Sequence, residues 1–155
     1  MDSTTSKSIK LVTFKIASHW FALPMANVLK IVNCPSPSKG SVILFGVVQL
    51  GNHTIQLLDL YGTFGLGTNA KPPVQPQFLL VLRMHKKTLW GIVLEAPPDL
   101  IELPLDLLKS ISVDQRFVPR KQWISHIAVV SEQTIKRTLL LLDLKAVFKP
   151  ETMAA

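Results

Sequence analysis

The stretch LLDLYGTF at residues 57–64 returns near the end of the chain as LLDLKAVF at residues 141–148. In both copies an apolar run ends at an aspartate, and large apolar side chains then recur at helical spacing. Each copy therefore predicts a strand followed by a short helix. The aspartates, Asp59 and Asp143, are either catalytic carboxylates or the N-caps of these helices.

The capping role is the favoured interpretation of the two aspartates. A catalytic pair would have to share one cleft, whereas equivalent positions in two repeated units should lie apart. An N-cap Asp accepts hydrogen bonds from the free backbone N–H groups of the first turn and typically contributes about 0.5–2 kcal/mol. We expect Asp59→Ala to lower the stability of the protein without abolishing binding.

The rest of the chain also repeats. IKLVTFKI alternates between two faces, and HWFALP follows it after a turn, which is typical of a β-hairpin. The first half contains about five short strands, a count typical of a small SH3-like barrel. After the Gly/Pro-rich residues 65–77 the pattern restarts, with Trp90 where Trp20 stood before. Such a repeat of whole supersecondary units predicts two related lobes. The second lobe's strands FLLVL and TLLLL are apolar on both faces, so we expect them to be covered on both sides.

The composition excludes a largely disordered chain, because 48% of the 155 residues are apolar and 17% are charged. The net charge of +7 is spread over both halves, and its densest cluster is DQRFVPRKQW at residues 114–123. A solvated connection is the favoured interpretation of this cluster. A basic β-barrel that binds nucleic acid through Arg116, Arg120 and Lys121 stays open as the alternative function.

The residue pattern offers no catalytic chemistry. The four histidines are widely separated, and none lies beside a Cys or an acidic residue at metal-ligand spacing. No phosphate loop and no nucleophile with a nearby base is present. We therefore predict no enzyme, no catalytic residue, no metal and no cofactor.

Cys34 is the only cysteine in the sequence, so an internal disulfide is excluded. We interpret Cys34 as an incidental loop residue. No signal peptide or membrane-spanning run is evident, which predicts a cytoplasmic protein.

The order of these blocks resembles the CheW-like adaptor family of bacterial chemosensory arrays. The blocks LVTFKIASHWFALPMANVLKIV, GVVQLGNHTIQLLDLYGTFGL, FLLVLRMHKKTLWGIVLEAPPDLIELP and ISHIAVV…LLLLDLKAVF follow the family's order over about residues 9–149. The resemblance implies an all-β fold with short helices, in which two SH3-like five-stranded β-barrels pack around a shared hydrophobic core.

The expected organisation is therefore one CheW-like domain at residues 9–149, made of two pseudo-repeated lobes. The lobes span about residues 9–66 and 77–149, with exchange of strands between them allowed, and residues 1–8 and 150–155 are expected to be flexible termini. The resemblance implies a non-catalytic adaptor that couples chemoreceptors to a CheA-type histidine kinase, in an array that controls chemotaxis or pilus motility. It implies neither nucleic-acid binding nor direct insertion into the membrane, but recruitment to membrane-associated receptor arrays.

The family's kinase-contacting positions fall on Val28, Ile31 and Gly46. Strand alternation puts Val28 and Ile31 on opposite faces if no bulge intervenes, so core packing of one of them stays open as the alternative to a kinase contact.

The family's receptor-facing groove falls on Leu50, Gly51, Leu79 and Leu80, where an amphipathic receptor helix could lie. The family commonly carries NLRG where this chain reads QLGN, so Gly51 stands in place of an arginine. A missing guanidinium removes a multidentate donor. The sequence therefore supports kinase binding more strongly than receptor binding.

Overall fold

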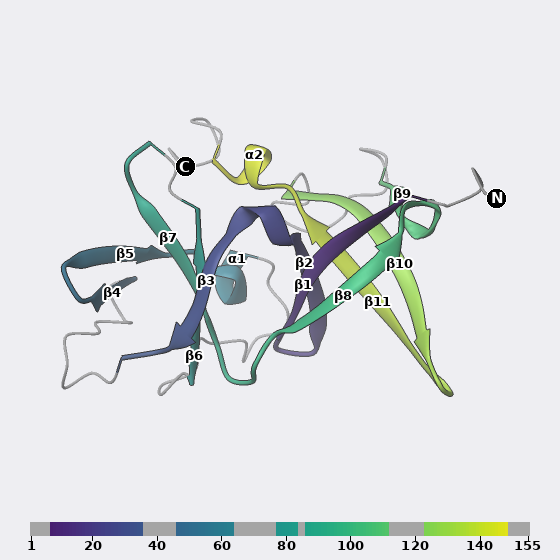
Figure 1. The fold of residues 1–155 in the computed structure, drawn as a ribbon, viewed down its shortest axis with the longest axis horizontal. Coiled ribbons are helices and arrows are strands. Elements are labelled where there is room, and N and C mark those ends of the chain that lie inside the picture. The colour runs from purple at the N-terminus through teal and green to yellow at the C-terminus, as the bar shows by residue number, and fades with distance from the viewer. Residues whose placement is uncertain (1–6, 36–45, 64–76, 84–85, 112–122, 149–155) are drawn as a thin grey trace.

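The computed structural model arranges the chain as two curled β-sheets that lie side by side (Figure 1). It describes residues 7–35, 46–63, 77–83, 86–111 and 123–148. The expected flexible termini, 1–8 and 150–155, lie outside these residues except for Lys7 and Ser8. So do nearly all of the Gly/Pro-rich boundary at 65–77 and, apart from Trp123, the basic cluster at 114–123.

The first sheet has six strands and is built around the β1–β2 hairpin. Its strands in spatial order are β8 (Asp99–Pro104), β1 (Ser8–Ile16), β2 (His19–Pro24), β11 (Ile135–Leu142), β10 (Ile124–Glu132) and β9 (Lys109–Ser110). All neighbours are antiparallel except β2 and β11, which run parallel. The sheet has one strand more than the expected five, because the two-residue β9 adds to the edge of β10.

The second sheet has five strands and repeats this plan. Its strands in spatial order are β3 (Val28–Asn33), β6 (Phe78–Leu82), β7 (Leu89–Leu94), β5 (His53–Leu57) and β4 (Val47–Leu50). Here β5 and β7 form the parallel pair. Each sheet thus combines strands from early and late parts of the chain: β1 and β2 pair with late strands, while β3 to β5 share a sheet with β6 and β7.

Two short helices follow the repeated LLDL segments. The helix α1 spans Leu60–Thr63 and α2 spans Leu144–Val147, where the sequence predicted them. At α2 the N-cap is Asp143, whose carboxylate accepts a hydrogen bond from the backbone N–H of Lys145. The capping interpretation of Asp143 is therefore confirmed. Single 3-10 turns at Met25–Asn27 and Leu105–Leu107 follow β2 and β8.

The largest buried cluster joins the two sheets. The rings of Phe14 and Phe21 stack with their centres 6.0 Å apart, and from the second sheet Leu80 and Ile92 belong to the same cluster. Both short helices contribute to it as well. Two smaller clusters lie within the individual sheets. The sequence's expectation of a shared hydrophobic core is confirmed.

The strand β6 lies between the shared core and the smaller core of the second sheet and contributes side chains to both. Its residues Leu79 and Val81 belong to the cluster of the second sheet, and Leu80 and Leu82 belong to the shared cluster. All four are fully buried. Because successive side chains of a strand point to opposite faces, a strand covered on both sides must be apolar throughout. The prediction made from FLLVL is confirmed.

Candidate partner-binding surfaces

A β-bulge in β3 decides which way the predicted kinase-contacting side chains point. Val28 lies opposite Leu82 and Ile31 lies opposite Leu80, because the register shifts between Val28 and Lys30. Three steps along β3 thus match two steps along β6. A bulge adds one residue to a strand and reverses the alternation after it. Val28 and Ile31 consequently face the same side of the sheet, and the bulge removes the expectation of opposite faces.

The two side chains nevertheless differ in their surroundings. Val28 is half-buried and packs against the shared core. Ile31 leaves 44% of its surface exposed, although Leu80 opposite it is fully buried. A substitution of Val28 therefore affects both the surface and the core, whereas a substitution of Ile31 affects mainly the surface.

A shallow apolar groove of about 270 Å³ runs between the edge strands β3 and β8. We call it the β3–β8 groove; its lining residues are Val12, Met25, Val28, Leu29, Lys30, Ile31, Pro98, Asp99 and Leu100. Among its described lining residues only Lys30 and Asp99 are charged, and their formal charges cancel. Apolar contacts rather than charge would dominate binding here.

Exposed apolar side chains gather at this groove. Four of the eight large apolar side chains that stand exposed among the described residues line it: Met25, Leu29, Ile31 and Leu100, with 40, 47, 44 and 61% of their surface accessible. Single exposed apolar residues are ordinary, but a contiguous group of them marks an interaction surface. The sequence analysis found Ile31 and missed the other three. Leu29 lies in the bulge and Leu100 lies on an edge strand, and the alternation of apolar and polar residues in the sequence does not show that either side chain is exposed.

Gly46 lies outside the β3–β8 groove, immediately before β4. Its φ of +74° falls in the left-handed region that favours glycine, and its carbonyl oxygen accepts a hydrogen bond from Leu57 N–H at 2.8 Å. A Cβ at this position would meet no atom within 4 Å. The backbone conformation, rather than a lack of space, therefore accounts for a glycine here.

The turn between β4 and β5 carries Leu50 and Gly51, two of the predicted receptor-contacting residues. Leu50 pairs with His53, which leaves Gly51 and Asn52 as a two-residue loop. Gly51 has a φ of +60°, whereas Asn52 has no positive φ. Glycine in the first position of a two-residue hairpin loop is typical of a type II′ turn.

The side chain of Gln49 fixes this turn from one side. Its amide Nε2 donates to the Gly51 carbonyl oxygen at 3.2 Å, and its Oε1 accepts from the Thr54 hydroxyl at 2.8 Å. Leu50 is half-buried against the core of the second sheet, and Gly51 is exposed. The exposed tip of the turn is therefore backbone, with no side chain at Gly51 to contact a partner.

Leu79 and Leu80 cannot serve as the surface residues that the sequence analysis expected. Both lie on β6, a central strand of the sheet, and both have 0% of their surface exposed. A strand that is apolar on both faces does not reveal whether it is central or at an edge, and here it is central. The two leucines pack the cores on either side of β6 and present nothing to a partner.

The described residues contain no group of three or more His, Cys, Asp or Glu side chains that could hold a metal ion. Cys34 is half-buried, and this burial raises the pKa of its thiol, which keeps it protonated. No helix within the described segments is long and apolar enough to span a membrane.

Comparison with known proteins gives a consistent result for the whole chain. The family model described as a CheW-like domain matches residues 10–151. Among solved structures, the chain is similar to the scaffolding protein TtCheW from Thermoanaerobacter tengcongensis. The match has a TM-score of 0.67 and 15% sequence identity, and it covers 98% of this chain and 95% of that chain. The fold is thus that of two SH3-like barrels. No curated protein matches the sequence significantly.

Proposed function

Because the chain belongs to the CheW-like family, we propose that it is a non-catalytic adaptor that couples chemoreceptors to a CheA-type histidine kinase in a bacterial chemosensory array. The observation that carries the proposal is the exposed apolar β3–β8 groove, whose lining includes the family's kinase-contacting positions Val28 and Ile31. Two partners held at separate surfaces of one domain would be brought together, and this function needs no catalytic group.

The regulatory domain of the kinase is the proposed occupant of the β3–β8 groove. Exposed Met25, Leu29, Ile31 and Leu100 would lose water on docking, and burial of apolar surface stabilises a complex by about 25 cal/mol per Å² before the costs of association. The groove lies between the edge strands of two different sheets, so a partner seated in it would contact both lobes at once.

The variant Ile31→Glu tests this assignment. Ile31 is exposed, so the fold should survive, whereas a carboxylate buried without a partner in the interface should weaken kinase binding about thirtyfold or more. The measurement is the affinity for the isolated regulatory domain of the kinase, with thermal unfolding as the check on folding.

The matched control is Val129→Glu on β10. Val129 is also a β-branched apolar residue with about half of its surface exposed, at 51%, and it does not line the β3–β8 groove. It should bind the kinase domain as the native protein does. Equal affinities for the native protein and Ile31→Glu would refute the groove as the kinase site.

The receptor-facing surface is proposed at the β4–β5 turn, around Leu50 and Gly51. This turn lies at the edge of the second sheet and leaves its backbone exposed for a receptor helix. No lysine or arginine occurs between Gln49 and Thr54 to replace the arginine that the family commonly carries. We therefore propose that receptor binding at this turn is weak.

A paired substitution tests the effect of the missing arginine. Arginine alone at position 51 would be strained by the φ of +60°. Gly51→Arg is therefore combined with Asn52→Gly, because a glycine at the second loop position can adopt the positive φ instead. The double variant should bind a soluble receptor tip fragment more tightly than the native chain, and Asn52→Gly alone should not. If the double variant folds normally without any gain, the turn is not the receptor contact.

The proposed location is the cytoplasm, with recruitment to receptor arrays at the membrane through the two partners. Fluorescence imaging in cells that lack the receptors or the kinase would test it, because clustering at the membrane should then be lost.

A further inference from the structure

The strand β11 extends beyond its neighbour β2 and leaves a free edge. The parallel pairing of the two strands begins where Leu139 lies opposite Trp20. Among the strands that the structure describes, residues 135–138 pair only with β10 on their other side, because the chain before β2 has already turned at Ala17 and Ser18. Backbone groups of this segment that point away from β10 face no described strand, and an unpaired strand edge is the property that allows a sheet to accept another strand.

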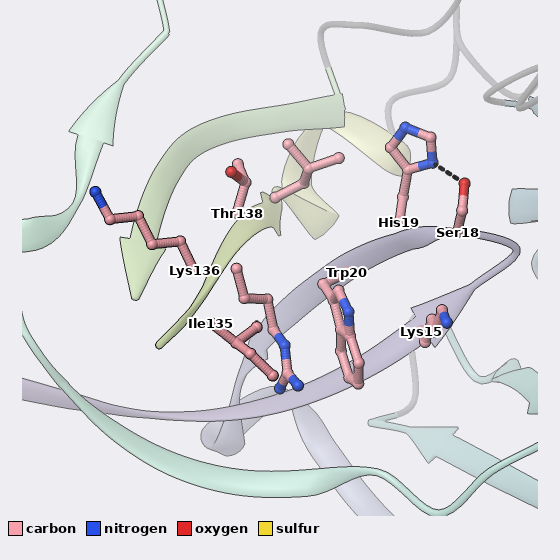
Figure 2. Close-up of a pocket in the computed structure, with 9 residues that line it drawn as sticks. Lys15, Ser18, His19, Trp20, Ile135, Lys136 and Thr138 are labelled. Atoms are coloured by element: carbon pink, nitrogen blue, oxygen red, sulfur yellow. Dashed lines mark hydrogen bonds between the residues drawn. The ribbon is translucent and has the colours of Figure 1, made fainter. Parts of the chain in front are cut away.

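A hollow of about 500 Å³ lies beside this free edge. It is bounded by side chains of β11, such as Lys136 and Thr138, and side chains of β2, such as His19 and Trp20 (Figure 2). The hydroxyl of Ser18 lies 3.3 Å from His19 Nδ1 at its rim. We call it the β2–β11 notch.

The β2–β11 notch is strongly cationic. Lys15, Lys136 and Arg137 line it, and no described Asp or Glu side chain does. Within the described residues, none of these three cations forms an ion pair. Three positive charges around one hollow attract anions from solution, in a chain whose net charge is already +7.

Arg137 is held in place by an aromatic ring. Its guanidinium carbon lies 3.7 Å from the centre of the Trp20 ring. This cation–π contact orients the planar guanidinium while leaving the N–H groups at its edge able to donate to a carboxylate. The side chain is therefore positioned before any ligand arrives, which lowers the entropy cost of binding.

The cations are distributed over both faces of one strand. Lys136 and Arg137 are adjacent on β11, so their side chains point to opposite faces. Both side chains line the hollow from opposite faces of the strand, so a compact anion such as phosphate fits this distribution of charge less well than an extended chain does. An extended peptide that pairs with residues 135–138 places its own side chains alternately on the two faces, and acidic side chains at adjacent positions would reach both.

We propose that the β2–β11 notch binds an extended acidic peptide segment of a partner protein, which adds to the free edge of β11 as a further strand. Backbone hydrogen bonds to residues 135–138 give the segment its direction and register. Carboxylates on one face meet Lys136, and carboxylates on the other face meet Arg137 and Lys15. This surface is separate from the β3–β8 groove, with which it shares no lining residue.

The test uses the full chain and a short acetylated peptide of consecutive Glu residues flanked by Val. Lys136→Ser and Arg137→Ser should each weaken its binding by about two- to fivefold, the range of partly exposed ion pairs. Lys10→Ser removes one exposed cation of β1 that does not line the notch and should leave binding unchanged. All three positions are exposed or half-buried, and circular dichroism verifies the fold of each variant.

Three further probes distinguish the occupants. The same peptide with a central Pro, which lacks one backbone donor, should bind more weakly if strand addition occurs. Inorganic phosphate should compete poorly. Binding of the Glu peptide should protect from hydrogen exchange those amides of residues 135–138 that point away from β10. Three results would overturn the proposal. The first is that Lys10→Ser weakens binding of the Glu peptide as much as Lys136→Ser and Arg137→Ser do, and the second is that phosphate displaces the peptide fully. The third is a single-stranded oligonucleotide that binds more tightly than the peptide and depends on Lys136 and Arg137.

Discussion

The carboxylate of Asp143 accepts a hydrogen bond of 3.1 Å from the backbone N–H of Lys145, at the first turn of α2. This contact assigns a structural role to the aspartate of the second LLDL segment. The helix that it begins contributes Ala146 and Val147 to the core shared by the two sheets. The cap therefore supports the packing of α2 against the shared core.

Replacing Asp143 should lower the stability of the fold without changing partner binding. Asp143→Ala removes the acceptor and should cost about 1 kcal/mol in the free energy of unfolding, measured by urea denaturation. Asp143→Asn keeps a capping oxygen and should recover most of that loss. An asparagine variant as unstable as the alanine variant would show that the negative charge, rather than the hydrogen bond, matters. Binding of the kinase domain should be unchanged in both.

The sequence predicted local elements well because they depend on neighbouring residues. The β1–β2 hairpin, the two short helices and the apolar strand β6 lie where their patterns placed them. The six-stranded sheet did not follow from those patterns, because the pairing of β2 with β11 joins Trp20 to Leu139 across most of the chain. No local periodicity specifies which of several apolar strands becomes the neighbour.

The same limit applies to the binding surfaces. The bulge in β3 brings Val28 and Ile31 to one face of the sheet. The segment NVLKIV contains no Gly or Pro from which this bulge could have been predicted. The sequence analysis looked for a dense basic cluster and found residues 114–123. The cationic notch is instead assembled from Lys15 and Arg137, which lie on different strands and meet only through the parallel pairing of β2 with β11.

Gly91 marks a close approach between strands of the second sheet. A Cβ there would lie 2.9 Å from Ile55 Cγ2 and 3.0 Å from Leu79 Cδ1. Both neighbours are fully buried, so Gly91→Ala should overpack the core and destabilise the protein by about 1–3 kcal/mol.

A double-mutant cycle checks this cause. Leu79→Val removes the δ-methyl groups that the new Cβ would meet, so the combined variant should be less destabilised than the sum of the two single variants. Strict additivity in urea denaturation would mean that the loss arises elsewhere.

The thiol of Cys34 should react slowly in the folded protein. Its partial burial against the core of the second sheet raises the pKa of the thiol, so less thiolate is present at neutral pH than in the unfolded chain. The measurement is the rate of reaction with an aromatic disulfide reagent, with and without urea. The chain has one cysteine, so the signal belongs to this site alone. Equal rates in both conditions would contradict the expectation.

Tyr61 should make the fold sensitive to alkaline pH. It is 5% exposed in the shared core, and desolvation, with a smaller contribution from the negative charge of Glu95, raises its pKa from 10.0 to about 12. The unfolded chain therefore loses this proton at lower pH than the folded chain does. The stabilisation is fully present below pH 10.0 and decreases as the pH rises towards about 12.

Two measurements check this titration. Tyr61 is the only tyrosine in the chain, so the ultraviolet absorbance of tyrosinate reports on it alone. Its midpoint should lie near 12 in the folded protein and near 10.0 in urea. Tyr61→Phe keeps the ring in the core and removes the ionisable group, so its stability should decrease less between these two pH values than that of the native protein. An identical loss in both proteins would assign the alkaline sensitivity to other groups.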